Sequence, residues 1–176
     1  MDLADCRVVA GKVNWDLQEK FKEDMGEIKE LDDLAYAELT IMMVMAMNDG
    51  LLVTAVDGPL MRLRKAIEKG IPLPEVPWPF IGEIKYNPTP DSANFLYARV
   101  YFSEPINNLT HHAYNETNAV IALRAGAKDP NGDRNEGYLE QDGLIIDSMT
   151  RMKAYCGQND CKFIVVKTSQ EGSCNE

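Results

Sequence analysis

The feature that most constrains this fold is a run of four prolines in the middle of the chain. They are Pro72, Pro74, Pro77 and Pro79. Each proline fixes its backbone φ angle and lacks an N–H donor, so this run is excluded from a helix interior and from a central strand. We therefore expect an extended surface segment over residues 71–80, with different secondary structure before and after it.

Before this segment the sequence predicts helix. Apolar residues recur mostly at steps of three and four from Leu17 to Met45, which indicates one long amphipathic helix. Asp16 is the expected N-cap, with Glu19 as its capping-box partner. We expect a break or bend at Gly26, because glycine in a helix costs roughly 1 kcal/mol relative to alanine.

The end of this helix has two interpretations. The apolar run 40–47 is followed by Asn48, Asp49 and Gly50 and then by a second apolar run, a pattern that is also typical of a β-hairpin. We prefer a helix up to Met47, because helix-forming residues dominate positions 34–47. A second helix is predicted from Asp57 to Gly70.

After the proline run the sequence predicts strands. The clearest is Asn94–Ser103, where side chains alternate between a wholly apolar face and a face of aromatic residues with Arg99. This alternation favours a sheet that is covered on one side. Further strands are expected at 7–10, 83–86, 118–126 and 163–167. Loops are expected at 104–117 and 128–137, and residues 138–156 are expected to begin as strand, at 138–139 and 144–146, and to end as helix.

These elements define the expected fold class. It is α+β, with a long N-terminal helix and a second helix packed on a small, mostly antiparallel sheet. The length of 176 residues suits a single domain over 1–176. Residues 1–58 form its helical part, and residues 59–176 hold the second helix, the proline-rich connector and the sheet.

The charge and apolar content restrict the partners. A net charge of −10 disfavours binding to nucleic acid through phosphate contacts and suits protein partners. The N-terminal residues lack the pattern of a secretory signal, and the longest apolar run, 39–47, is too short to cross a bilayer. We expect neither membrane insertion nor secretion.

One loop has the spacing of a calcium site. Asp129, Asn131, Asp133 and Glu140 occupy places 1, 3, 5 and 12 of the D-x-N-x-D…E pattern. However, the required glycine at the sixth place is Arg134, which would bring a cation among the ligands. A solvated loop is therefore the preferred interpretation, with calcium as the alternative.

The cysteines and histidines do not form a recognisable catalytic pattern. Cys156 and Cys161 are separated by four residues, not by the two of a redox or zinc motif, and we expect free thiols unless the compartment is oxidising. The adjacent His111 and His112 would point to opposite faces of a strand. We therefore expect no catalytic residue, no cofactor and no enzymatic activity.

Two groups of residues are candidates for partner binding. Trp78, Phe80 and Tyr86 lie in or just after the proline run, where they either anchor a neighbouring subunit or fold back onto the chain's own sheet. The second group is acidic and lies on one face of the predicted long helix: Glu23, Glu27 and Glu30.

The middle of the chain resembles tail-terminator and tail-completion proteins of long-tailed bacteriophages. The resemblance covers residues 59–153 and rests on the runs 76–80, 87–90 and 95–101, which read VPWPF, NPTP and FLYARVY. It implies an α+β protein that forms a homo-oligomeric ring at the end of the tail tube, in a virion assembled in the host cytoplasm. An acidic wall would let DNA pass through such a ring without adhering to it.

Three functions follow from these observations. The first is a non-enzymatic structural protein, either a tail terminator or a head–tail joining component. The second is a cytoplasmic acidic inhibitor or immunity protein that covers a basic site on its partner. The third is a small cytoplasmic enzyme with a site built from the 104–117 and 129–148 loops.

Overall fold

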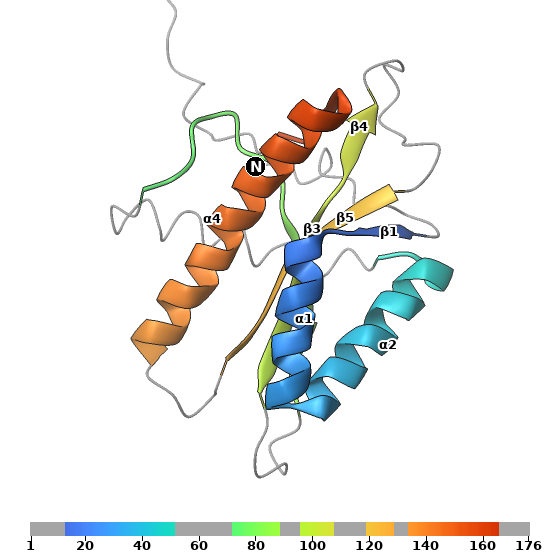
Figure 1. The fold of residues 1–176 in the computed structure, drawn as a ribbon, viewed down its shortest axis with the longest axis vertical. Helices are drawn as coiled ribbons and strands as arrows, with labels where there is room; N and C mark the ends of the chain where they lie inside the picture. The colour runs from blue at the N-terminus through green and yellow to red at the C-terminus, as the bar shows by residue number, and fades with distance from the viewer. Residues whose placement is uncertain (1–12, 52–71, 89–95, 108–118, 129–133, 166–176) are drawn as a thin grey trace, which may run out of the picture.

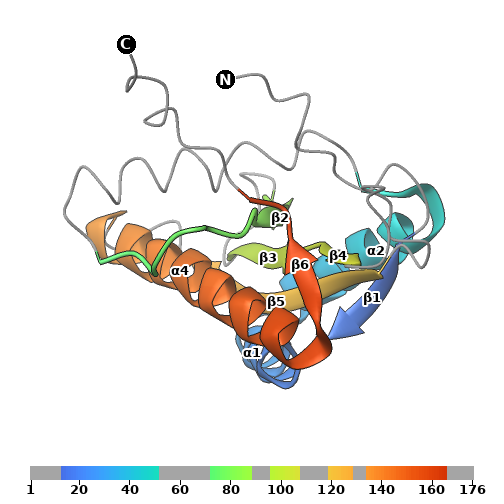
Figure 2. The same cartoon turned by 90° about the horizontal axis from the view of Figure 1, so that it is seen from above.

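The computed structural model describes residues 13–51, 72–88, 96–107, 119–128 and 134–165. A four-stranded sheet lies between α1 and α2 on one face and α4 on the other (Figures 1 and 2). Strand order is β1-β5-β3-β2, with β3 antiparallel to both neighbours and β1 parallel to β5. The expected α+β class with a mostly antiparallel sheet is confirmed.

The described elements are β1 (Asn14–Leu17), α1 (Glu19–Leu31), α2 (Asp33–Asp49), β2 (Gly82–Tyr86), β3 (Tyr97–Ser103), β4 (Pro105–Asn107), β5 (Ala119–Lys128), α4 (Arg134–Asn159) and β6 (Cys161–Phe163).

The predicted single N-terminal helix is two helices. The chain breaks at Asp32, whose backbone is extended, and not at Gly26, which lies inside α1. The Asp32 side chain accepts the N–H groups of Leu34 and Ala35, both at 3.0 Å, and so starts α2. The expected N-cap at Asp16 is also wrong, because Asp16 lies in β1 and Gln18 precedes α1 without a side-chain cap.

The end of α2 decides between helix and hairpin. Residues 40–47 are helical, and α2 ends at Asp49. Gly50 follows with a positive φ of 84°, and its N–H donates to the Ala46 carbonyl at 3.0 Å. The preferred helix is confirmed. The helix predicted from Asp57 to Gly70 lies outside the described residues, as does the strand predicted at 7–10.

The central strands agree with their predicted positions. β2 and β3 pair with Ile84 opposite Val100, and β5 covers the strand expected at 118–126. The expectation that the sheet is covered on one side is wrong. Val100 and Phe102 are buried beneath α1 and α2, whereas Tyr101 is buried in the cluster that contains α4.

The C-terminal half differs most from the predictions. Residues 134–159 form α4, so neither the loop expected up to Gly137 nor the strands expected at 138–139 and 144–146 are present. Four buried side chains of α4 recur at steps of four, three and four, which is the period of a helix packed on one face. They are Ile145, Met149, Met152 and Cys156.

Three short strands also depart from expectation. β1 was not predicted, and β4 lies in the expected loop 104–117, of which residues 108–117 are outside the description. β6 begins two residues before the strand predicted at 163–167 and pairs with β4 in a separate two-stranded sheet. Pairing of residues distant in sequence made these strands difficult to predict from local pattern.

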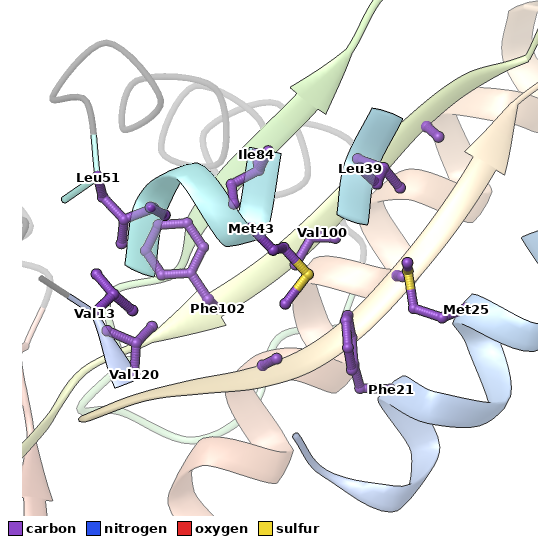
Figure 3. Packing of buried hydrophobic residues seen from close by; sticks show 14 of the residues in the cluster. Val13, Phe21, Met25, Leu39, Met43, Leu51, Ile84, Val100, Phe102 and Val120 are labelled. Carbon is purple, nitrogen blue, oxygen red and sulfur yellow. The ribbon is translucent and has the colours of Figure 1, made fainter. Parts of the chain in front are cut away.

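The larger core lies between the sheet and the two N-terminal helices. Phe21 and Met25 of α1, Leu39 and Met43 of α2 and Phe102 of β3 all point into it (Figure 3). Trp15 contacts the Phe102 ring edge to face, with the ring centroids 5.8 Å apart. This core fixes α1 and α2 side by side on the sheet, which determines the surface that they present outward.

Candidate functional site

The outer face of α2 is unusually apolar for a surface helix. Leu34, Ile41, Val44 and Met45 are each about half exposed, at 54%, 51%, 49% and 55%. On the opposite side of the same helix, Ala35, Leu39, Met43 and Ala46 are buried in the core. A helix that is apolar all round is normally covered on all sides. The outer face of α2 is therefore a candidate protein-binding surface.

The outward residues of α2 follow a coiled-coil spacing. Alternating steps of three and four residues connect a row that we call the α2 stripe, composed of Leu34, Ala37, Ile41, Val44 and Asn48. This spacing keeps one side of a helix facing a partner helix along its length. The stripe carries no charged residue. Acidic residues border it, at Asp33, Glu38 and Asp49.

A groove of about 550 Å³ lies beside the stripe, between α1 and α2. Its walls are mainly apolar, and Val44 belongs to both the groove and the stripe. The Trp15 indole N–H donates to the Met43 carbonyl at 3.0 Å, which fixes the ring in the wall. Methionine side chains adapt to different shapes. The groove can accept apolar side chains that extend past a helix docked on the stripe. Its apolar lining includes Trp15, Phe21, Met25, Met43, Val44 and Met47.

A buried ionic network joins α1, β5 and α4. Asp24 is 3% exposed and accepts from Arg124 at 2.6 and 3.2 Å and from the Ala125 N–H at 3.0 Å. Arg124 also donates to Asp147, which accepts from Arg151 at 2.7 Å. Burial raises the pKa of Asp147, but hydrogen bonds from Arg151 and Arg124 outweigh burial and hold that pKa below its usual value. These charges satisfy one another, so we assign the network a structural role.

A second ionic cluster lies on the β2–β3 pair. The Glu83 carboxylate is fully buried, with Lys85 Nζ at 2.6 Å and Arg99 Nη1 at 3.1 Å. Two cations at this distance offset the cost of burying one carboxylate. The cluster was not predicted, although alternation placed Arg99 on the face opposite the wholly apolar one. Its charges are also occupied with one another.

The described part of the chain contains no group of three His, Cys, Asp or Glu side chains able to hold a metal ion. Of the calcium candidates, Asp129, Asn131 and Asp133 lie outside it. Glu140 is exposed on α4, which already begins at Arg134, the sixth place of the proposed loop. A helix over the second half of the motif is inconsistent with a twelve-residue loop that wraps around calcium. His111 and His112 are also outside the described residues.

The aromatic candidates near the proline run lie against their own chain. Phe80 is 4% exposed in the larger core, and Tyr86 packs beside that core. Trp78 is partly buried against the α4 cluster, and its indole N–H donates to the Pro74 carbonyl at 2.7 Å. The Phe80 side chain is therefore part of the core and is not available to a partner. The proline run is exposed only in its first part, where Pro72, Glu75, Val76 and Pro77 face solvent.

The acidic candidates are on the surface of α1. Glu23, Glu27 and Glu30 are all exposed, on the side of α1 away from the core. Lys20 donates to Glu23 at 3.0 Å, so one of the three already has a basic neighbour. Surface pairs of this kind are weak because water screens both charges, which leaves Glu23 able to bind another cation. The three carboxylates together form an acidic surface on the same side of the sheet as α2.

Sequence reasoning missed the α2 stripe. It assigned Leu34 and Met45 to the buried side of one continuous helix, but the break at Asp32 rotates α2 so that both face outward. The available signal was the composition of residues 39–47, which are apolar except for Thr40. Such a run cannot have only one apolar face.

No helix among the described residues is long and apolar enough to cross a membrane. Comparison with known proteins gives no relative: no protein-family model, no curated protein and no solved structure matches the chain.

Proposed function

We propose that the chain is a non-enzymatic structural protein that assembles with copies of itself through the α2 stripe. The observation that supports this most directly is the uncharged apolar row on the outer face of α2, centred on Ile41 and Val44. In water, a row of apolar side chains about half exposed favours association, because each contact removes apolar surface from solvent.

The net charge favours this surface over others for contact between copies. Each chain carries a net charge of −10, so two copies repel each other over most of their surfaces. The α2 stripe has no charge, and Asn48 near its end can pair with another amide as a polar residue in a coiled-coil seam does. A second copy is thus the occupant that we propose for the stripe.

The resemblance to phage tail proteins gives this assembly a setting. We propose a homo-oligomeric ring in a phage-like virion, as a tail terminator or a head–tail joining component, assembled in the host cytoplasm. In this ring the α2 stripe of each copy contacts the groove of the next copy, because contact of the stripe with itself would close at two copies. The acidic surface of α1, including Glu23, Glu27 and Glu30, suits a protein close to passing DNA because it repels phosphate.

Light scattering coupled to size-exclusion chromatography tests the assembly. We expect an oligomer of defined mass for the wild type and a folded monomer for Ile41→Glu, because the charge falls in the middle of the stripe. Ala154→Glu is the matched control, since it adds the same charge at an exposed position of α4. A wild-type protein that stays monomeric at high concentration contradicts the proposal.

A second candidate function is an acidic inhibitor that covers a basic site on another protein. The exposure of Glu23, Glu27 and Glu30 on one helix favours it. The triple reversal of these residues to lysine should abolish capture of a basic partner from host lysate while leaving the stripe intact. Capture that is unchanged by the triple reversal excludes this face.

A further inference from the structure

Two cysteine thiols meet at the C-terminal end of α4. Cys156 lies in the last turns of this helix and is 5% exposed, whereas Cys161 begins β6 and is partly buried. The chain reverses between them at Asp160, whose φ is +48°. The Cys161 thiol donates to Cys156 Sγ at 2.8 Å, and both cysteines are free. A disulfide bond is about 2.05 Å long, so little movement separates these sulfurs from bonding distance.

We infer that Cys156 and Cys161 form a reversible disulfide by exchange with a small-molecule disulfide such as glutathione disulfide. In the first step one protein thiolate attacks the small disulfide, which forms a mixed disulfide and releases one small thiolate. In the second step the other protein sulfur attacks the mixed disulfide and releases the second small thiolate. Two protein thiols are oxidised, one small disulfide is reduced to two thiols, and the two protein protons pass to these products.

The surroundings assign an order to the two sulfurs. Cys161 is the more accessible and meets the small disulfide first. Cys156 is buried in the apolar cluster between α4 and the sheet. Burial, together with the hydrogen bond to Cys161, raises the pKa of the Cys156 thiol. A buried, protonated thiol attacks slowly from solution but is well placed to attack a sulfur that is already beside it. Cys156 is therefore the second sulfur to react.

The bond would connect two elements that are now joined by a short turn. β6 pairs with β4 over three residues, and just beyond it the Ile164 carbonyl accepts the Phe80 N–H at 2.7 Å. Pro79 and Val165 form a further bridge. Oxidation would thus link β6 covalently to α4. The residues just after β6, Ile164 and Val165, pair with the end of the proline run. This inference is independent of the proposed assembly.

Mass spectrometry of the native, full-length chain tests the inference. The background variant carries Cys6→Ser and Cys174→Ser, so that only the pair remains. After exposure to glutathione disulfide we expect the loss of two hydrogen atoms, one peptide pair linked through Cys156 and Cys161, and full reversal by dithiothreitol. Adding Cys156→Ser should leave a stable glutathione adduct on Cys161.

Two results would overturn the inference. One is that both thiols of the background variant remain open to alkylation after native treatment with glutathione disulfide. The other is that they pair only after unfolding in guanidinium, since the folded geometry would then play no part. In the variant with Cys161→Ser we expect at least a tenfold slower adduct formation, at Cys156, than the Cys156→Ser variant shows at Cys161; equal rates would overturn the assigned order.

Discussion

At the scale of single residues, Asp32 connects three parts of the N-terminal half: the end of α1, the start of α2 and the residue before β3. One carboxylate oxygen caps α2, and the other accepts the Leu96 N–H at 3.2 Å, just before β3. The same side chain therefore starts a helix and connects it to the sheet. Because the break at Asp32 sets the rotation of α2, it also determines which apolar side chains face outward.

The first prediction concerns this cap. Asp32→Ala should lower the free energy of unfolding by about 1–2 kcal/mol, because two N–H groups of the first turn of α2 lose their acceptor. The measurement is urea denaturation followed by circular dichroism. Asp33→Ala is the control, since Asp33 is exposed and makes no cap, and it should change stability by less than about 0.5 kcal/mol. Equal losses for both variants would show that the cap is unimportant.

The second prediction compares two glycines. A methyl group on Gly82 would meet the buried Phe102 ring, whereas one on Gly26 would meet nothing within 4 Å. Gly82→Ala should therefore destabilise the protein by about 1–3 kcal/mol, through overpacking. Gly26→Ala should stabilise it by up to about 1 kcal/mol, because Gly26 lies inside α1. Thermal unfolding measures the stability of both variants. A loss of stability in Gly26→Ala would indicate that α1 bends at Gly26.

At the scale of elements, local pattern predicted β2, β3, β5 and the helix up to Met47, and it failed for β1, β4 and the first half of α4. β3 was predicted because its alternation between apolar and mixed faces is a local signal. α4 was mistaken in part for strand because the short apolar run 144–146 suits either structure, and only packing on the sheet decides between them. β1 pairs with β5 about a hundred residues later, a contact with no local signature.

The candidate surfaces were predictable to different degrees. The exposed carboxylates of α1 followed from the helical period, and Glu23, Glu27 and Glu30 are where it placed them. The outer face of α2 was not predictable from the helical period, because the extended residue Asp32 interrupts the helix and rotates every later side chain relative to α1. The turn between Cys156 and Cys161 was expected, but the distance between the two sulfurs was not predictable, because it depends on where α4 ends and β6 begins.

The third prediction concerns the ionic network that joins the two helical layers. The pKa of Asp147 is lower in the folded chain than its ordinary value of 3.8, so its ionised form stabilises the fold above that pH. This contribution should fall away as pH drops through the lower, folded pKa. Asp147→Asn should therefore be less stable than the wild type at pH 7, with the difference shrinking below about pH 4.

Urea denaturation at several pH values measures this difference. Glu140→Gln is a suitable control, because Glu140 is also on α4 and exposed. It should show no comparable pH-dependent difference from the wild type. A constant gap between wild type and Asp147→Asn from pH 7 to pH 2 would contradict the role assigned to Asp147.

At the scale of the whole molecule, the two faces of the sheet have different surroundings. The α4 face receives the proline run, where the Lys153 ammonium donates to the Glu75 carbonyl and Trp78 packs beside the α4 cluster. The other face carries α1 and α2, with the apolar stripe and the acidic surface outward. The first face is thus covered by segments of the chain itself, and the second carries the surfaces for which we propose contacts with other molecules.

The fourth prediction tests this division with Trp78→Ala. The variant should lose about 2–4 kcal/mol of stability, because a partly buried indole and its hydrogen bond to Pro74 are removed. Its assembly state should match that of the wild type in light scattering. Val76→Ala, at a position 71% exposed, is the control and should change neither property. A folded Trp78→Ala monomer would instead place the indole in a subunit interface.

The short length of β1 has a consequence for solubility. β1 pairs with residues 119–122 of β5, so along the rest of β5 no described strand lies on that side. An open edge of this kind invites another chain to add a strand and grow into an aggregate. Here the Asp24 carboxylate accepts a hydrogen bond from the Ala125 N–H, and the Arg124 guanidinium donates to the same carboxylate. The buried Asp24 carboxylate thus occupies one backbone donor of this edge, which should disfavour the addition of another strand there.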